Sequence, residues 1–258
     1  MDIGNPNLKP SRANNYDLLY EQYLKPLGLL QGGFFFKQLS NPIFESVKSV
    51  LTPVLAQQYG INPNSVYVQD GWVLSRPLNG KSATVYGLEI SYQQHLTFLP
   101  GALGGIGLSA NYGYTHSSTT GVPLRTDRPA LQRQAPNSWN FSPTYDRWRV
   151  SARLGVSHND ANIFSYAYQD LNPDGTSNPV PLGIKGPGGD TYLYAHTQVD
   201  AQASFRMYRG LHLIVSGLNL TNEVFGFYNG STQFPIQREY YKTSYMFGLR
   251  YTLSNEPK

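Results

Sequence analysis

The sequence predicts an all-β protein: a segment of an antiparallel, up-and-down transmembrane β-barrel with about nine strands. Apolar and polar residues alternate with a period of two in segments of about ten residues, the length with which a tilted strand crosses a bilayer. Charged residues are only 14% of the chain, against about 25% in ordinary soluble domains, and aromatic residues also reach 14%. Connections between the expected strands alternate between short and long, as in outer-membrane barrels.

The N-terminal half of the chain supplies four of these strands. The first is expected at residues 15–24, where Tyr16, Leu18 and Tyr20 share one face and acidic residues lie on the other. After a short turn, residues 29–37 place phenylalanines on the outward face. The third and fourth strands alternate aromatic or aliphatic residues with small or polar ones, which predicts a lipid-facing and a lumen-facing side. They span residues 84–92 and 106–116.

The C-terminal half supplies the other five strands. The closing strand shows the alternation best, because Tyr245, Phe247 and Leu249 occupy one face and mainly polar residues the other. In the sixth strand, aliphatic residues such as Leu154 alternate in the same way with arginine, serine and glycine. The five strands span residues 138–145, 148–157, 196–208, 211–221 and, for the closing strand, about 239–253.

The long connections are expected on one side of the barrel and the short turns on the other. A soluble β-sandwich has no reason for such alternation, and buried parallel strands would show continuous apolar runs instead. A short helix is expected at residues 53–59, inside the first long connection. Short turns are expected at Lys25, Pro100, Asp146 and Arg209, and long loops at residues 40–80, 117–137, 169–189 and 222–234.

The composition argues against several classes of function. No run approaches the ~18 apolar residues of a spanning helix. The chain has no cysteine, and its net charge of +4 comes with scattered arginines, so we expect neither a thiolate site nor a nucleic-acid partner. The five histidines show no metal-ligand spacing, and no hydrolase or metalloprotease motif occurs. We therefore expect no enzyme activity, metal centre or cofactor.

One segment resembles half of a calcium-binding loop. Asp170 to Gly175 matches the pattern D-x-N-x-D-G, whose side chains can converge on Ca²⁺. The twelfth position, however, is Pro181 rather than a bidentate glutamate. A surface turn rich in asparagine, proline and glycine is therefore the favoured interpretation.

Aromatic and cationic residues of the long loops are the candidate ligand-binding residues. Rings can cover a sugar face, and arginines can bind an anionic chelate. The alternative for each residue is an ordinary solvated loop position. The candidates are Tyr67, Trp72, Arg125, Arg128 and Arg133.

Aromatic residues near the strand ends predict the two girdles of a membrane barrel. The alternative is plain cross-strand packing. The girdle beside the short turns comprises Phe98, Tyr145, Trp148, Tyr208 and Tyr251, and the girdle toward the long loops comprises Tyr112, Tyr114, Phe164 and Tyr166.

A set of short strings runs along the chain in a fixed order. They are Gly4–Pro10, Asn15–Leu18, Phe36–Lys37, Asn41–Ile43, Val85–Ile90, Leu108–Thr115, Leu218–Asn222 and Tyr245–Tyr251. Each string is weak alone, but the ordered set covers nearly the whole chain. The set resembles the late part of the barrel of TonB-dependent outer-membrane receptors.

The resemblance implies that residues 1–258 are the C-terminal portion of such a receptor barrel, without the signal peptide and plug domain. It implies a cell outer-membrane location, lipid and the missing strands and plug as partners, and the TonB complex only through the parent protein. The implied function is uptake of a scarce small solute: a siderophore, a cofactor or an oligosaccharide. Two alternatives stay open: an autonomous small barrel with a structural or porin-like role, and a soluble β-sandwich binding module.

An odd number of strands has a physical consequence. Bacterial single-chain barrels normally have an even count, and unpaired edge strands in hydrocarbon leave backbone groups unsatisfied at several kcal/mol each. We therefore expect the isolated chain to form either an open curved sheet or a closure between its first and last strands.

Overall fold

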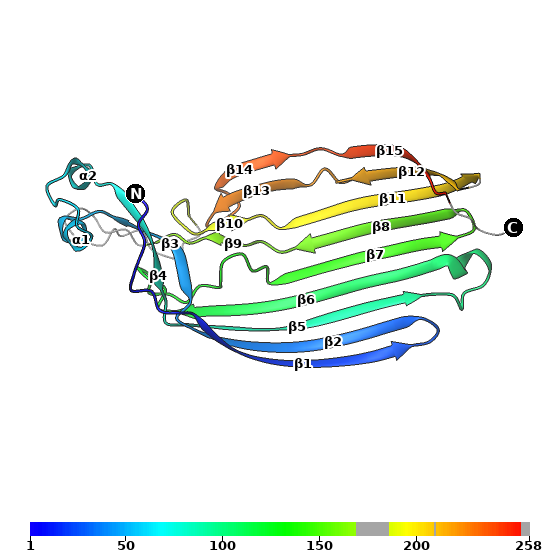
Figure 1. Ribbon diagram of the computed structural model, residues 1–258, viewed down its shortest axis with the longest axis horizontal. Coiled ribbons are helices and arrows are strands. Elements are labelled where there is room, and N and C mark those ends of the chain that lie inside the picture. Colours follow the sequence, from blue (N-terminus) through cyan, green and yellow to red (C-terminus); the bar gives the residue numbers. More distant parts are fainter. Residues whose placement is uncertain (169–185, 209, 254–258) are drawn as a thin grey trace.

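The computed structural model describes residues 1–168, 186–208 and 210–253. Nine strands form one antiparallel sheet in the order β1-β2-β5-β6-β7-β8-β11-β12-β15 (Figure 1). Each corresponds to an expected strand, which confirms the up-and-down arrangement. The strands are β1 (Arg12–Leu24), β2 (Gly28–Ser40), β5 (Ser82–His95), β6 (Ile106–Thr120), β7 (Asn137–Arg147), β8 (Val150–Asn159), β11 (His196–Tyr208), β12 (Leu211–Leu218) and β15 (Ser244–Tyr251).

The sheet is open. Strands β1 and β15 each have a neighbour on one side only, so they are its two edges. Of the two outcomes expected for the isolated chain, the structure confirms the open sheet and not a closure of the first strand on the last. The fold is thus a partial β-barrel, as the sequence predicts.

Most strands differ from their predicted bounds by a few residues, and two of the differences have a clear structural cause. Trp148 has a positive φ of 57° and lies in the turn, so β8 begins at Val150 and the tight turn falls at 148–149 rather than 146–147. The closing strand begins at Ser244, because residues Pro235–Tyr240 form a separate strand, β14, that pairs with β13 (Val224–Asn229) in a second sheet. A period-two pattern does not show which sheet a strand joins.

The register places the alternating apolar residues on one continuous face. Ile90 lies opposite Tyr112, and Tyr112 opposite Trp139. Phe247 of this face is 72% exposed, so no protein layer covers it. The face is the expected lipid-facing band, which includes Tyr86, Leu88, Ile90, Leu108, Ala110, Val150, Ala152, Leu154, Phe247 and Leu249.

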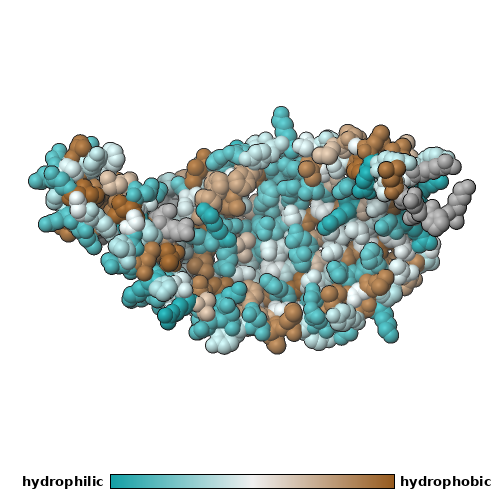
Figure 2. Space-filling model, viewed as in Figure 1, coloured by the Kyte–Doolittle hydropathy of each residue, from teal (hydrophilic) through white to brown (hydrophobic). Residues whose placement is uncertain are grey.

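The opposite face is polar. On it, the Asn140 amide donates to Asn111 at 2.9 Å, and Arg153 donates to Ser142 at 3.2 Å, each bond joining neighbouring strands. Figure 2 shows hydrophilic residues over the middle strands of the sheet, with hydrophobic residues toward its margins. This face has the composition of a barrel lumen.

One glycine on the polar face is required by close packing. A Cβ at Gly87 would lie 2.6 Å from the ring of Phe35 and 2.0 Å from the backbone oxygen of Tyr114. Any larger residue would displace the ring or separate β5 from its neighbours. The Phe35 ring therefore covers a strand position that offers no side chain of its own.

The long connections lie at one end of the sheet and the short turns at the other (Figure 1). This confirms the expected sidedness. The β2–β5 connection contains a hairpin of β3 (Ile43–Val50) and β4 (Val73–Asn79), with α1 (Pro53–Gln58) and α2 (Val66–Gln69) between them. Helix α1 matches the helix predicted at residues 53–59.

A second sheet also lies among the long connections. Its order is β14-β13-β10-β9, with β9 at Asn162–Ser165 and β10 at Thr191–Leu193. The short-turn end holds a 3₁₀ turn, η1, at Gly101–Gly105. No helix in the described residues is long and apolar enough to span a membrane.

Most buried apolar residues lie among the long connections, and the two in the main sheet, Ala83 and Val85, are at the start of β5 next to these connections. Phe44, Val47, Val122, Ile163 and Tyr166 form one cluster, here called the loop core. A smaller tip core gathers around α1 and α2 and comprises Leu51, Ala56, Val68 and Leu74. Residues 1–3 pair with β4, and the Ile3 amide donates to the Ser75 carbonyl at 3.0 Å. Through this pairing, Ile3 packs against the tip core.

The two faces of the sheet generate a first prediction. Ala152→Arg puts a charge on the apolar face and should destabilise the membrane-inserted protein by about 2–4 kcal/mol near the midplane. Ser151→Arg, one residue away on the polar face, is the matched control and should change little. Urea titration of the protein folded in lipid vesicles measures both. Equal effects of the two substitutions would contradict the assignment of the faces.

Candidate functional site

The loop core holds three long connections together. It joins Phe44 and Val47 from the β2–β5 connection, Val122 from the β6–β7 connection, and Ile163 and Tyr166 from the β8–β11 connection. The rings of Phe44 and Tyr166 lie 5.7 Å apart. The connections thus form one packed body at the end of the main sheet rather than separate loops.

A buried arginine adds a polar connection to this body. The Arg125 guanidinium donates from Nε and Nη2 to Asp127, and from Nη1 and Nη2 to Asp190. Nη1 also donates to the carbonyl of Ala167 at 3.1 Å. Since a guanidinium has five N–H donors, every one of them is in use. We call Arg125, Asp127 and Asp190 the Arg125 cluster.

The side chains of the Arg125 cluster are largely buried. The side chain of Arg125 is 0% exposed, that of Asp190 5%, and that of Asp127 36%. Burial alone would lower the pKa of Arg125, but the hydrogen bonds that Arg125 donates to Asp127 and Asp190 outweigh it and raise that pKa. The hydrogen bond from Arg125 likewise lowers the pKa of Asp127. We assign Arg125 a role in holding the loops, because it has no exposed surface for a solute.

Tyrosines complete the surroundings of the Arg125 cluster. Arg125 stacks over the ring of Tyr166 at 4.9 Å, and the Tyr166 hydroxyl donates to the Ala130 carbonyl at 2.5 Å. Burial raises the pKa of Tyr168 to about 12. These phenols therefore stay neutral and add no charge at physiological pH.

The other two predicted arginines are exposed. Arg128 lies at the surface of the β6–β7 connection. Arg133 is anchored through its backbone, whose amide donates to the Ile163 carbonyl at 2.6 Å, and its guanidinium lies 4.8 Å from the centre of the Phe164 ring. Both cations are thus displayed on a connection that the Arg125 cluster and the loop core hold in place.

The predicted aromatic candidates form a second group. Tyr67 and Trp72 contact edge to face with their ring centres 4.8 Å apart, and they are 39% and 45% exposed. Tyr67 lies in α2 and Trp72 follows it, and Figure 1 shows this helix at the far end of the long-connection side. The structure therefore brings the five candidate residues together as two groups, one in the β6–β7 connection and one at the tip.

Sequence reasoning missed an aromatic cluster on the second sheet. Tyr192 stacks on Tyr228 at 5.3 Å, Tyr194 contacts Tyr228 at 4.7 Å, and Arg238 lies over the Tyr194 ring at 5.8 Å. Tyr192, Tyr228 and Arg238 lie in β10, β13 and β14, and Tyr194 directly follows β10; no second sheet was expected in these segments. Tyrosine at both 192 and 194 was the only local signal, and it does not indicate the partner strand.

One predicted girdle residue is buried in the loop core, and the others lie toward the two ends of the main sheet. Phe98, Trp148, Tyr208 and Tyr251 are exposed at the short-turn end, with Tyr145 beside them, while Tyr112, Tyr114 and Phe164 lie toward the long connections. Tyr166 is only 6% exposed and belongs to the loop core. We therefore leave Tyr166 out of the girdle; whether the others meet the lipid interface stays a prediction.

The calcium-like segment Asp170–Gly175, Pro181 and most of the expected loop at 169–189 lie outside the described residues. Among the residues that are described, no group of three or more histidine, aspartate or glutamate side chains could hold a metal ion.

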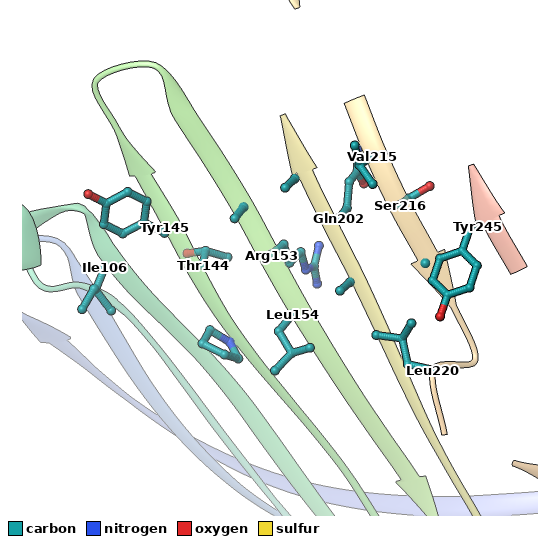
Figure 3. A pocket seen from close by; sticks show the side chains of 15 residues that line it. Ile106, Thr144, Tyr145, Arg153, Leu154, Gln202, Val215, Ser216, Leu220 and Tyr245 are labelled. Carbon is teal, nitrogen blue, oxygen red and sulfur yellow. The ribbon is translucent and has the colours of Figure 1, made fainter. Parts of the chain in front are cut away.

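A depression of about 590 Å³ lies on the apolar face of the main sheet (Figure 3). Apolar residues dominate its wall, including Ile106, Leu154 and Val215. Polar residues such as Arg153 alternate with these along the strands and belong to the other face. The depression offers few polar groups to orient a hydrated solute, so we do not place the site there.

The Arg125 cluster generates a prediction about loop order. Arg125→Met leaves the buried Asp190 carboxylate without its counter-ion, which typically costs about 3–5 kcal/mol. Trypsin should then cleave the Arg133–Gln134 bond about tenfold faster or more. Cleavage at Lys242–Thr243, in the β14–β15 connection, is the internal control. Unchanged cleavage at Arg133 would show that the Arg125 cluster does not hold this loop.

A second prediction from the Arg125 cluster concerns pH. Because the folded-state pKa of Asp127 is lowered, its stabilising effect is full above the unfolded value of about 3.9 and is lost as pH falls through the folded pKa. Pepsin cleavage beside Leu124 or Leu131, normalised to an unstructured peptide, should rise below about pH 4. In Asp127→Asn, normalised cleavage should be high and nearly independent of pH. A wild-type rate that is flat with pH would contradict the assignment.

Comparisons with known proteins agree with this architecture. Residues 1–222 match the family described as TonB dependent receptor-like, beta-barrel. The ferric-catecholate import receptor Fiu of Escherichia coli K12 is 14% identical, with a TM-score of 0.57 over 94% of this chain and 28% of its own. The ferripyoverdine receptor of Pseudomonas aeruginosa is 14% identical, with a TM-score of 0.57 over 95% and 27%. The copper transporter OprC is 13% identical, with a TM-score of 0.57 over 93% and 31%.

Comparison with curated protein sequences gives no match. The chain spans less than a third of each solved structure just named, and at these identities the structural likeness concerns the fold alone. The family match, in contrast, covers most of the chain and agrees with the open sheet, its sidedness and its two faces. The chain therefore belongs to the family of TonB-dependent receptor-like β-barrels and forms part of such a barrel.

Proposed function

We propose that this chain is part of the wall of an outer-membrane receptor, and that its long connections capture a scarce solute for TonB-dependent uptake. The observation that carries the proposal is the packed body of long connections at one end of a two-faced sheet. This body displays exposed rings and cations. It lies at the end of the main sheet, whose polar face has the composition of a lumen.

The arrangement suits capture better than passive permeation. A solute has to be held by groups already in position if binding is to be tight, since ordering mobile loops costs free energy. Arg128 and Arg133 offer positive charge to an anionic solute, and Tyr67 and Trp72 offer ring faces. The relatives named above carry ferric chelates or copper, so a metal complex is the first solute to test, ahead of a cofactor or an oligosaccharide.

Energy coupling belongs to parts of a parent protein beyond these strands. In this proposal, a plug domain and the TonB complex act through the parent, whereas the present chain contributes wall and loops. Outer-membrane lipid is the partner of the apolar face, and a Gram-negative cell surface is its location.

The alternative proposal is an autonomous small barrel with a structural or porin-like role. Strands β1 and β15 argue against it, because each would leave a row of backbone groups unpaired in hydrocarbon at several kcal/mol per group. Pairing of both edges with further strands removes this cost, which favours a larger barrel.

Uptake by cells expressing the parent receptor tests the proposal. The pair Arg128→Ala/Arg133→Ala, and separately Trp72→Ala, should weaken binding of a transported ferric chelate by about tenfold or more. Trp148→Ala, a tryptophan at the short-turn end, is the matched control and should leave binding unchanged.

Surface display is checked in the same cells. A single Asn64→Cys, at an exposed position near the tip, can be labelled with an impermeant maleimide to count receptors at the surface, and the receptor without this substitution gives the background. Normal labelling with unchanged binding in every loop variant would show that these connections do not capture the solute.

A further inference from the structure

A pocket of about 270 Å³ opens beside the Arg125 cluster, where three parts of the chain meet. The β6–β7 connection, the start of β9 and the start of β10 supply its walls. The residues that matter below are Asp127, Pro129, Gln134, Ile163, Asp190 and Tyr192.

The charged residues that line this pocket do not balance; they are Arg125, Asp127 and Asp190, and the exposed Arg128 and Arg133 of the same connection do not line it. The Arg125 cluster contains one guanidinium and two carboxylates, so it carries a net negative charge beside a pocket whose wall is partly apolar. Asp190 is nearly buried and is bonded to Arg125 and to the Ala167 amide. Asp127 keeps a third of its side chain exposed and retains unused acceptor positions. Charge in such surroundings favours a counter-ion.

Two neutral groups point to the same kind of ligand. The Oε1 atom of Gln134 is buried and accepts no hydrogen bond, although buried polar atoms are normally paired. Tyr192 contributes an aromatic ring to the wall, and rings attract cations. A hydrogen-bond donor that carries positive charge would satisfy Asp127, Gln134 and Tyr192 together.

We propose that this pocket binds a primary ammonium or guanidinium group carried on a short aliphatic arm of the captured solute, with Asp127 as its counter-ion. This inference rests on the capture function proposed above and specifies part of the solute. Pro129 and Ile163 line the apolar wall that accepts the methylene groups of the arm. The volume falls below the ~300–1,000 Å³ of sites for whole ligands of drug size, so the pocket takes an appendage and not the complete solute.

Agmatine, which ends in one ammonium and one guanidinium group, is the probe, and 1,4-butanediol is its neutral counterpart. Calorimetric titration of the purified parent receptor in detergent should show agmatine binding at least about tenfold more tightly than the diol. Added salt should weaken agmatine binding, because a charge pair carries it. Equal binding of the two compounds, or binding of neither, would overturn the proposal.

Two variants localise the probe. Asp127→Asn removes the counter-ion and should reduce agmatine affinity by about tenfold, while Gln134→Met removes the neutral acceptor and should reduce it by about threefold. Asp70→Asn, at an exposed carboxylate beside α2, is the matched control and should have no effect. Asp127→Asn should open its loop more often than the wild type, so tryptic cleavage at Arg133–Gln134 is compared with that in Arg125→Met; cleavage well below that of Arg125→Met shows that the folded loop still predominates. Full agmatine affinity in a folded Asp127→Asn protein would place the cation elsewhere.

A basic side chain of another polypeptide offers the same chemistry, so the tripeptide Gly-Lys-Gly is titrated in parallel. Tighter binding of agmatine supports a free solute, whereas tighter binding of the tripeptide would assign the pocket to a protein partner. These titrations do not depend on transport. Uptake that persists without agmatine binding overturns only this inference, and agmatine binding without uptake overturns only the proposed function.

Discussion

Every peptide group within a bilayer has to find its hydrogen-bond partner inside the protein, and the main sheet is built around that constraint. Antiparallel neighbours connected in sequence order satisfy each strand from both sides, from β2 to β12. The same constraint dictates the side chains, since a strand fixed in this ladder presents alternate residues to opposite faces. Lipid covers the apolar face, which in a soluble protein would pack against a hydrophobic core, and water covers the polar face.

Protein packing is therefore concentrated where the bilayer ends. In a soluble domain, buried apolar side chains lie between layers of secondary structure. Here they lie among the long connections, in the loop core and the tip core, and the Arg125 cluster adds a saturated set of charged hydrogen bonds. A solute-binding surface on loops requires such a scaffold, because loops have no ladder of their own to hold them.

The main sheet was predictable from sequence because the alternation that specifies each strand is local to that strand. Alternation along a single strand shows which residues face lipid, so all nine strands and the sidedness of their connections follow without knowledge of their partners. The turn at Trp148 was misplaced by two residues, since a bulky residue at positive φ gives no signal in the alternation pattern. The second sheet was missed, and residues 239–240 were given to the wrong strand, because pairing between β13 and β14 depends on the loop as a whole.

The candidate site was predicted less completely for the same reason. Arg128, Arg133, Tyr67 and Trp72 were identified by residue type, and the structure leaves all four exposed. The role of Arg125 depends on Asp190, a residue 65 positions away, and no spacing rule connects the two. The tyrosines at 192 and 228 likewise meet only through strand pairing.

The Arg125 cluster also constrains how receptors of this kind can diversify. Loops are often treated as interchangeable parts that can be exchanged one at a time on a constant barrel. In this chain, transplanting the β6–β7 connection alone would carry Arg125 and Asp127 away from Asp190 and leave a buried carboxylate behind. New specificities would therefore arise either by inheriting neighbouring connections as a block, or by point substitutions at exposed positions that leave the block intact.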